Sequence, residues 1–146
     1  MRVSDVLKDK NRGVITTTTG TSITQAMKQL IENSISCLPV LDEEEQLVGI
    51  VSDKDIFRAI HQNTENFTWM TCGDLMTTEV IIGVETDDLR YIGSLMTHNR
   101  IRHIPIMDDQ KLVGLVSVGD VVKMTMDSIE VENRYLKNYI TGAYPA

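Results

Sequence analysis

The chain has 146 residues, and 14 Lys and Arg against 21 Asp and Glu give it a formal net charge of −7. This balance argues against a nucleic-acid partner or an anionic membrane surface, since phosphate-rich partners need a basic face. No apolar run approaches the ~20 residues that span a bilayer. The chain begins without the apolar region of an export signal, and its two cysteines form no Cys-x-x-Cys pair, so a reducing cytoplasm is expected.

Periodicity in the first half predicts a strand, a helix, two further strands and a second helix. The first strand is short and apolar, at residues 14–16. Ser22 caps the following helix, whose apolar face has the spacing i, i+3, i+4, i+7 and i+8. That face consists of Ile23, Ala26, Met27, Leu30 and Ile31. Strands at about 37–41 and 47–51 enclose an acidic turn, and a closing helix begins after Ser52.

The second half gives the same order after a polar connection at 63–71, where Trp69 is expected to pack over the junction. An apolar strand at 80–82 precedes a helix that begins near Asp87 and Asp88. The apolar face of this helix is Leu89, Ile92, Leu95 and Met96. Strands follow at about 103–107 and 111–116. One long helix is predicted from about 118 to 139, ended by Gly142 and Pro145.

The two halves repeat one sequence pattern. An apolar-Pro-apolar strand around Pro39 recurs around Pro105, 66 residues later. The run Leu-Val-Gly-x-Val-Ser-x-x-Asp ends at Asp55 and again at Asp120, 65 residues later, because the second acidic turn is one residue shorter. The pattern predicts an α/β (α+β) chain of two β-α-β-β-α modules. Neither module buries much core alone at ~60 residues, so the two sheets are expected to pack together.

The repeated Gly-h-x-Ser-x-x-Asp motif (h, apolar), with the h-Pro-h strand before it, resembles the CBS domain, the cystathionine-β-synthase-like module. The resemblance covers roughly residues 1–125, and both motifs are complete. It implies two modules related by a pseudo-twofold axis, at 1–62 and 72–125, joined by the connection at 63–71. A helical tail at 126–146 resembles that of stand-alone bacterial and archaeal CBS pairs.

In the family, clefts between paired modules bind adenine-containing ligands. The resemblance therefore implies a regulatory ligand such as AMP, the first choice, or ADP, ATP, NAD or S-adenosylmethionine. The motif's Asp holds the ribose hydroxyls and its Ser helps to hold phosphate. These roles fall on Ser52 and Asp55 in one site and on Ser117 and Asp120 in the other. The strands that line the clefts supply Val14, Ile15, Thr16, Val80, Ile81, Ile82, Cys37, Arg102, His103 and Pro105.

Physical chemistry supports a ligand site at the motif but also allows a purely structural role. One carboxylate can accept hydrogen bonds from both ribose hydroxyls. A Ser at the start of a helix lies beside free N–H groups and the positive end of the helix dipole, which suit a phosphate. Ser-x-x-Asp is also a capping-box-like helix start that needs no ligand. The two roles can coexist, because a capped helix end still offers other N–H groups.

The second Pro-containing strand carries more positive charge than the first. Arg102 and His103 precede its proline, whereas Ser36 and Cys37 stand at the matching positions of the first repeat. The site that contains Asp120 is therefore expected to bind an adenylate more strongly than the other site.

Three functional classes remain open. The favoured one is a regulatory module that senses an adenine nucleotide and signals to an unidentified protein. An enzyme is disfavoured, because Walker, Rossmann and metalloprotease signatures are absent and a catalytic (β/α)₈ barrel needs about 250 residues. No catalytic residue, catalytic cofactor or metal is predicted. The third class is a structural dimerisation module with empty clefts. A homodimer is expected, since apolar helical faces extend beyond what one sheet covers.

Overall fold

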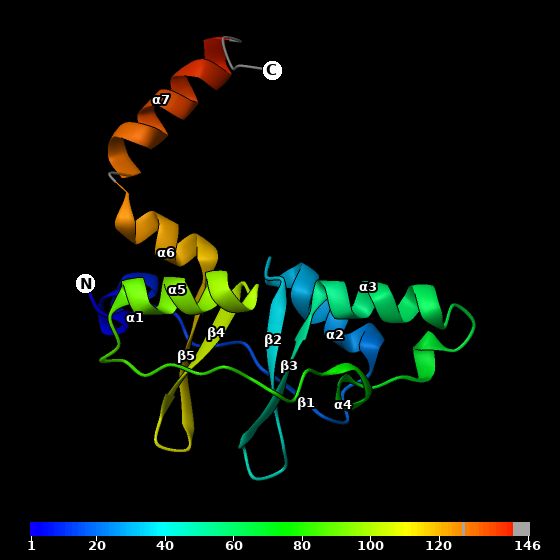
Figure 1. The fold of residues 1–146 in the computed structure, drawn as a ribbon. Coiled ribbons are helices and arrows are strands. Elements are labelled where there is room, and N and C mark those ends of the chain that lie inside the picture. Colours follow the sequence, from blue (N-terminus) through cyan, green and yellow to red (C-terminus); the bar gives the residue numbers. More distant parts are fainter. Residues whose placement is uncertain (127, 142–146) are drawn as a thin grey trace.

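The computed structural model, which describes residues 1–126 and 128–141, divides into two halves of the same design (Figure 1). Each half packs helices against a small sheet, with strand orders β1-β2-β3 and β4-β5. The first half contains β1 (Thr17–Thr18), α2 (Ile23–Glu32), β2 (Cys37–Leu41), β3 (Leu47–Ser52), α3 (Asp53–Gln62), η1 (Phe67–Trp69) and α4 (Cys72–Leu75). The second contains α1 (Val3–Lys10), α5 (Leu89–Asn99), β4 (His103–Asp108), β5 (Lys111–Ser117) and α6 (Val118–Thr125), and α7 (Ser128–Thr141) follows.

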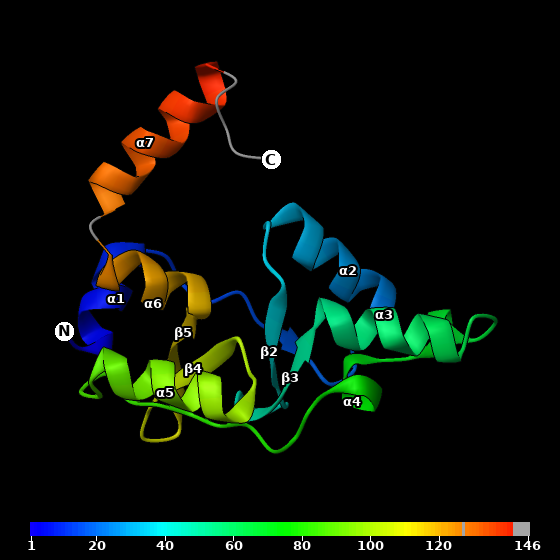
Figure 2. The ribbon, with the colours of Figure 1, turned by 45° about the horizontal axis from the view of Figure 1, so that its top comes forward.

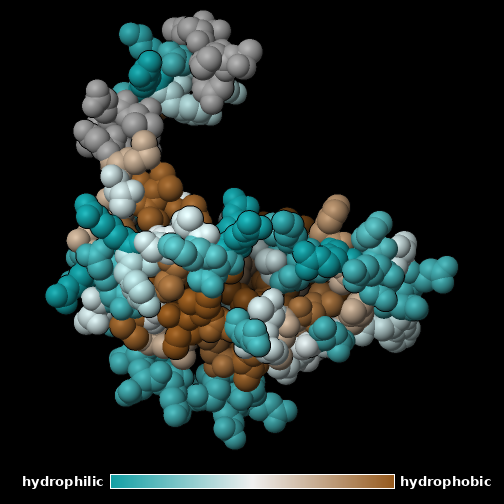
Figure 3. All heavy atoms as spheres, viewed as in Figure 1, coloured by the Kyte–Doolittle hydropathy of each residue, from teal (hydrophilic) through white to brown (hydrophobic). Residues whose placement is uncertain are grey.

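The two hairpins repeat each other in register, which confirms the mixed α/β fold of two modules. β2 and β3 pair antiparallel with Cys37 opposite Ser52, and β4 and β5 pair with His103 opposite Ser117. Both hairpins change register two residues after the central proline. The acidic turn between β2 and β3 is closed by Asp42, whose Oδ1 accepts from two backbone N–H groups at 2.9 Å. Figure 3 shows both hairpin tips as hydrophilic projections.

Each half has its own apolar core, formed between its helices and its hairpin. The first core includes Ile23, Ala26, Leu30, Leu38, Val40, Val51, Ile56, Ala59 and Cys72. The second includes Val3, Val6, Leu89, Ile92, Met96, Ile104, Ile106 and Val116. The predicted apolar faces of α2 and α5 are thus confirmed, except at Ile31, which is 77% exposed.

Each core also contains a helix that belongs, by sequence, to the other repeat. Val3 and Val6 of α1, at the start of the chain, are buried in the second core. Cys72 of α4, which follows the connection between the halves, is buried in the first core. Figures 1 and 2 both show α1 beside α6, and α4 below α3. The chain therefore crosses between the halves twice before it reaches α5.

The predicted first strands at 14–16 and 80–82 are wrong in position. The strand of the first half is β1, where Thr17 pairs parallel with Val40. Within the described part of the second half, the corresponding parallel pairing is a single bridge between Gly83 and Ile106. Parallel pairing with the Pro-containing strand thus begins one residue after each predicted segment. Residues 14–16 and 80–82 themselves form no strand ladder.

The predicted long C-terminal helix is also wrong. α6 ends at Thr125, whose hydroxyl donates to the carbonyl of Val121 at 2.8 Å, and Met126 is extended with φ −109° and ψ 154°. α7 is a separate helix that extends away from both halves in the two views (Figures 1 and 2). Gly142 and Pro145 lie outside the described residues. None of the helices in the described ranges has the length and hydropathy of a membrane span.

Trp69 does not pack over the junction between the halves. Its side chain is 84% exposed, at the end of the short helix η1. The contacts of η1 are instead with α2, and Phe67, two residues earlier, packs against the first core. The aromatic residue that anchors this connection is therefore Phe67.

Candidate functional site

Two clefts of similar volume contain the two Ser-x-x-Asp motifs. The first, of about 730 Å³, is lined by Ser117 and Asp120 and is called the Asp120 cleft here. The second, of about 680 Å³, is lined by Ser52 and Asp55 and is called the Asp55 cleft. Both volumes fall in the range of small-molecule sites in proteins.

Each cleft combines the motif of one repeat with the first segment of the other. Val14 and Ile15 line the Asp120 cleft, and Val80 and Ile81 line the Asp55 cleft. These apolar residues belong to the segments that were predicted as strands. Thr16 and Ile82 line neither cleft: the carbonyl of Thr16 accepts from Gln29 Nε2 at 2.9 Å, and Ile82 is 49% exposed.

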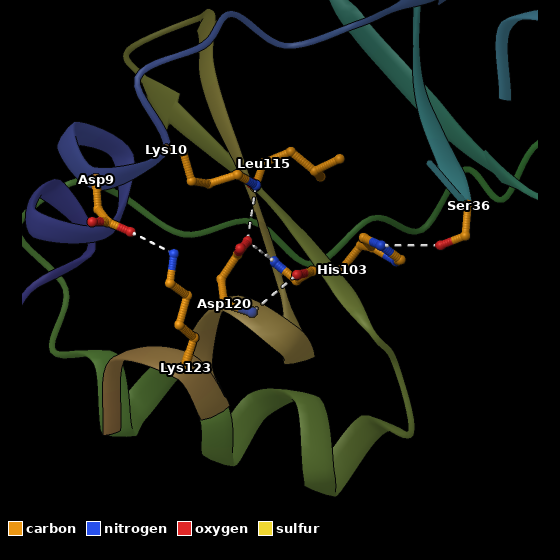
Figure 4. Close-up of polar contacts among 8 residues, drawn as sticks. Asp9, Lys10, Ser36, His103, Leu115, Asp120 and Lys123 are labelled. Carbon is orange, nitrogen blue, oxygen red and sulfur yellow. Dashed lines mark hydrogen bonds and ion pairs between the residues drawn. The ribbon is translucent and has the colours of Figure 1, made fainter. Parts of the chain in front are cut away.

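Four residues at the starts of β2 and β4 form a wall that both clefts share. They are Ser36, Cys37, Arg102 and His103. Ser36 Oγ and His103 Nε2 form a hydrogen bond of 3.4 Å across the two hairpins (Figure 4). The sequence pattern assigns the charge of Arg102 to the Asp120 cleft. In the structure, Arg102 lines both clefts. Pro105 lines neither cleft and is buried in β4.

Both motifs form a capping box, the structural role that Ser-x-x-Asp can have without a ligand. At the start of α3, Ser52 N–H donates to Asp55 Oδ2 at 2.9 Å, and Asp55 N–H donates to Ser52 Oγ at 3.2 Å. At the start of α6, the corresponding bonds between Ser117 and Asp120 are 2.8 and 3.1 Å. Each box uses only Oδ2 of its carboxylate. Oδ1 of Asp120 accepts no hydrogen bond from a described residue, so a ligand hydroxyl has an acceptor there.

Lys10 distinguishes the Asp120 cleft from the Asp55 cleft. Its Nζ donates to Asp120 Oδ2 and to the carbonyl of Leu115, both at 2.8 Å (Figure 4). Burial by itself raises the pKa of Asp120, but the hydrogen bonds from Lys10 and Ser117 outweigh it and hold that pKa below its usual value. Among the described residues, the cationic partner of Asp55 is the exposed Arg58, at 3.9 Å.

The shared wall offers no charged nucleophile or base. Burial raises the pKa of the Cys37 thiol to about 12, and the charges of Asp55 and Asp53 add to this effect. Burial also lowers the pKa of His103, assisted by the positive charges of Arg102 and Lys10. At neutral pH the thiol is therefore protonated and the imidazole is uncharged, so both groups act as neutral hydrogen-bonding or packing groups.

Several residues that line the clefts were not among the predicted site residues. Lys10 and Arg12 line the Asp120 cleft, and Glu79 and Arg100 line the Asp55 cleft. Only the helical spacing of the apolar residues in α1 offered a signal for Lys10, since it indicates a helix whose last turn is basic. The other three residues carry no motif, and only the path of the chain brings them to the clefts.

The family model of the CBS domain matches residues 3–62 and 72–127. The chain is 34% identical over 151 residues to the CBS domain-containing protein CBSX3, mitochondrial, of Arabidopsis thaliana, with 97% of this chain and 73% of that protein covered. It is also 32% and 34% identical to an L-aspartate semialdehyde sulfurtransferase and an inosine-5′-monophosphate dehydrogenase of Methanocaldococcus jannaschii. The matches cover 84% and 81% of this chain but only 23% and 22% of the length of those two enzymes.

Solved CBS proteins share the fold. A CBS-domain protein of Agrobacterium tumefaciens has a TM-score of 0.81 and 28% identity, with 86% of this chain and 93% of that chain covered. The CBS pair of protein MJ0100, solved with 5′-methylthioadenosine and S-adenosyl-L-methionine, has a TM-score of 0.76 and 32% identity over 85% and 94%. CBSX2 in complex with AMP has a TM-score of 0.71 and 25% identity over 90% and 98%.

Two tandem matches to the family model cover most of the chain, and the two halves of the structure repeat one hairpin, one bulge and one capping box. Homologous pairs have been solved with adenosine ligands. The chain therefore belongs to the CBS domain family and carries two CBS domains in tandem.

Proposed function

We propose that the chain is a regulatory module that binds adenosine-containing ligands in the Asp120 and Asp55 clefts and signals their presence to a partner protein. The observation that carries this proposal is the composition of each cleft. A carboxylate at a helix start lies in the same cleft as apolar residues from the other repeat. AMP is the first choice, with ADP, ATP, NAD and S-adenosylmethionine as alternatives. The proposal assigns no catalytic step to the chain.

In the proposed binding mode, different residues of a cleft contact the ribose, the adenine ring and the phosphate of the ligand. The ribose hydroxyls donate to Asp55 or Asp120, which already hold their own helix starts through Oδ2. The adenine ring lies along Val80 or Val14, and Arg102 is available to phosphate from either side. Because each ligand touches both repeats, it binds only when the halves are correctly placed, and its binding energy favours that arrangement.

Substitution of the two carboxylates tests the proposal. Asp55→Ala and Asp120→Ala should each weaken AMP binding at their own cleft by roughly 10- to 150-fold, the effect of losing a hydrogen bond to a charged group. The double variant should show this loss at both clefts, so that no site of wild-type affinity for AMP remains. Calorimetric titration of protein stripped of bound nucleotide measures both effects.

Asp74→Ala is a matched control for the capping role. Asp74 closes the same kind of box with Thr71 at the start of α4 and lines neither cleft. This variant should lose about 1 kcal/mol of stability, as expected for a cap, and keep its affinity for AMP. Wild-type affinity in the double Asp55→Ala, Asp120→Ala variant would refute the proposal and leave a structural dimerisation module as the function.

The proposal includes a homodimer of two CBS pairs. Helices α2 and α3 expose Ile31 and Phe57, and α5 and α6 expose Tyr91 and Val122. Phe57 and Val122 occupy equivalent positions, two residues after the Asp of each motif. Apolar side chains exposed on both helical faces suit a second copy of the chain. Sedimentation should show twice the 16.4 kDa mass at micromolar concentration, and a monomer alone would contradict this part of the proposal.

A further inference from the structure

The helices α1 and α4, which begin the two sequence repeats, are structurally equivalent. α1 and α4 each begin with a capping box that contains an Asp at the third position. Leu7 of α1 lies against Gly114 of β5, where an added Cβ would be 2.5 Å from its side chain. Met76, just after α4, lies against Gly49 of β3 in the same way, at 2.6 Å. Leu7 and Met76 therefore mark matching places in the two halves.

The residues three positions after Leu7 and Met76 carry opposite charges. Lys10 follows Leu7 by three positions and lines the Asp120 cleft, whereas Glu79 follows Met76 by three positions and lines the Asp55 cleft. In the first repeat, three extra residues at 11–13 separate Lys10 from the apolar segment that begins at Val14. In the second repeat, Glu79 is followed directly by Val80. This extra segment brings Arg12 to the Asp120 cleft.

The two clefts consequently differ in their balance of charge. Three cationic side chains and one carboxylate line the Asp120 cleft: Lys10, Arg12, Arg102 and Asp120. Three cationic side chains and three carboxylates line the Asp55 cleft: Lys54, Arg100, Arg102, Asp53, Asp55 and Glu79. His103 lines both and is uncharged at neutral pH. A chain of phosphates is thus attracted by the first cleft and faces a balanced set of charges in the second.

We infer that the Asp120 cleft binds an adenosine ligand more strongly as phosphates are added to its 5′ group, whereas the Asp55 cleft favours an adenosine ligand without a phosphate chain. This division rests on the proposed function and specifies the ligand class of each site. Lys10 has three N–H donors, of which Asp120 and Leu115 engage two, so one remains for a phosphate oxygen. In the Asp55 cleft, Glu79 at the equivalent position repels phosphate and tolerates a neutral or cationic 5′ group.

The test uses ATP and 5′-methylthioadenosine as probes, titrated by calorimetry in magnesium-free buffer so that the phosphates keep their full charge. The Asp55→Ala variant reports the Asp120 cleft, and the Asp120→Ala variant reports the Asp55 cleft. The ratio of ATP affinity to methylthioadenosine affinity should be at least about tenfold larger in the Asp120 cleft, which is the effect of one charged hydrogen bond.

Charge substitutions then assign the preference to particular residues. In the Asp55→Ala background, Lys10→Met should weaken ATP binding by about tenfold or more and leave methylthioadenosine binding nearly unchanged. Arg12→Gln is the second variant, because Arg12 is exposed and forms no ion pair among the described residues, so the fold does not depend on it. In the Asp120→Ala background, Glu79→Gln should strengthen ATP binding, and Glu65→Gln, an exposed carboxylate outside both lining sets, is its control.

Two outcomes would overturn the inference, and they differ from each other. If both probes bind both clefts with the same affinity ratio, the division of ligands is wrong and the proposed function stands. If neither probe binds the wild-type chain, the proposed function and the division are both wrong. Loss of the ATP preference in Lys10→Met and Arg12→Gln, with methylthioadenosine binding retained, supports the division.

Discussion

The Asp120 and Asp55 clefts have the same backbone and different side chains beside the carboxylate. Both start from a hairpin with a bulge at the same position, a buried Gly and a Ser-x-x-Asp capping box. Lys10 Nζ donates a hydrogen bond to Asp120 in one cleft. Glu79, at the sequence position equivalent to Lys10, lines the other cleft together with Asp55. The repeat has kept the residues that the backbone requires. It varies those that line open space, because a change there costs little folding energy.

The largest expected difference between the halves concerns the two buried glycines. A Cβ on Gly114 would lie 2.5 and 2.7 Å from the two Cδ atoms of Leu7, and a Cβ on Gly49 would lie 2.6 Å from Met76 Sδ. Gly114→Ala should cost about 1–3 kcal/mol of unfolding free energy, the usual cost of overpacking. Gly49→Ala should cost more, because its Cβ would also lie 2.8 and 3.0 Å from Met76 Cγ and Cβ, next to a backbone that Thr77 fixes by two hydrogen bonds to Ile50.

Urea unfolding of both glycine variants measures this difference, with the midpoint and slope compared with wild type. Gly20→Ala is the control, since a Cβ at Gly20 meets nothing within 4 Å. Equal losses in Gly114→Ala and Gly49→Ala would mean that α1 and the segment after α4 do not differ in how tightly they pack.

A smaller and pH-dependent effect is expected for Lys10→Met. The pKa of Asp120 is held below its unfolded value of about 3.9, so the pair stabilises the fold above that pH and loses its effect as pH falls through the folded pKa. Lys10→Met should therefore lose about 1 kcal/mol at pH 7 and progressively less as pH falls below about 3.9. Thermal unfolding over this pH range provides the measurement.

Lys8→Met is the matched control, because Lys8 is exposed on the same helix. It should change stability little at any of these pH values. A loss for Lys10→Met that is as large at pH 3 as at pH 7 would show that the Lys10 side chain stabilises the fold by packing and not through its charge.

The smallest effect is expected for Arg58→Met, the variant of the ion-pair partner of Asp55. Arg58 and Asp55 are 3.9 Å apart and Arg58 is 60% exposed, so solvent screens this ion pair. Its removal should change the unfolding free energy by less than about 0.5 kcal/mol. A loss as large as that of Lys10→Met, measured in the same urea titration, would mean that both motif carboxylates have a strong internal counter-ion.

Local sequence patterns predicted those parts of the fold that local interactions determine. The hairpins, the caps and the apolar faces of α2 and α5 follow from residues that are close in sequence. Val14 and Ile15 have strand-like side chains, but pairing with β2 begins only at Thr17, and no property of the segment itself decides this.

The contents of the clefts were less predictable than the motifs, because they depend on long-range contacts. Lys10 and Asp120 are 110 residues apart in sequence, and nothing in either segment indicates that they meet. The long helix predicted after Ser117 failed for a different reason. Apolar residues continue at helical spacing, yet Thr125 bonds to carbonyls of its own helix and the next residue is extended.

Helices α1 and α4 each pack in the core formed by the other sequence repeat, and this exchange affects how the protein folds. A cut in the connection at 63–71 would leave α1 on one fragment and its core on the other, and would part α4 from the first core. Neither fragment would contain every element of a complete core. The second core closes only when the first helix of the chain meets segments about 80–110 residues later, which raises the contact order and slows folding. The two repeats therefore form one cooperative unit rather than two separable domains.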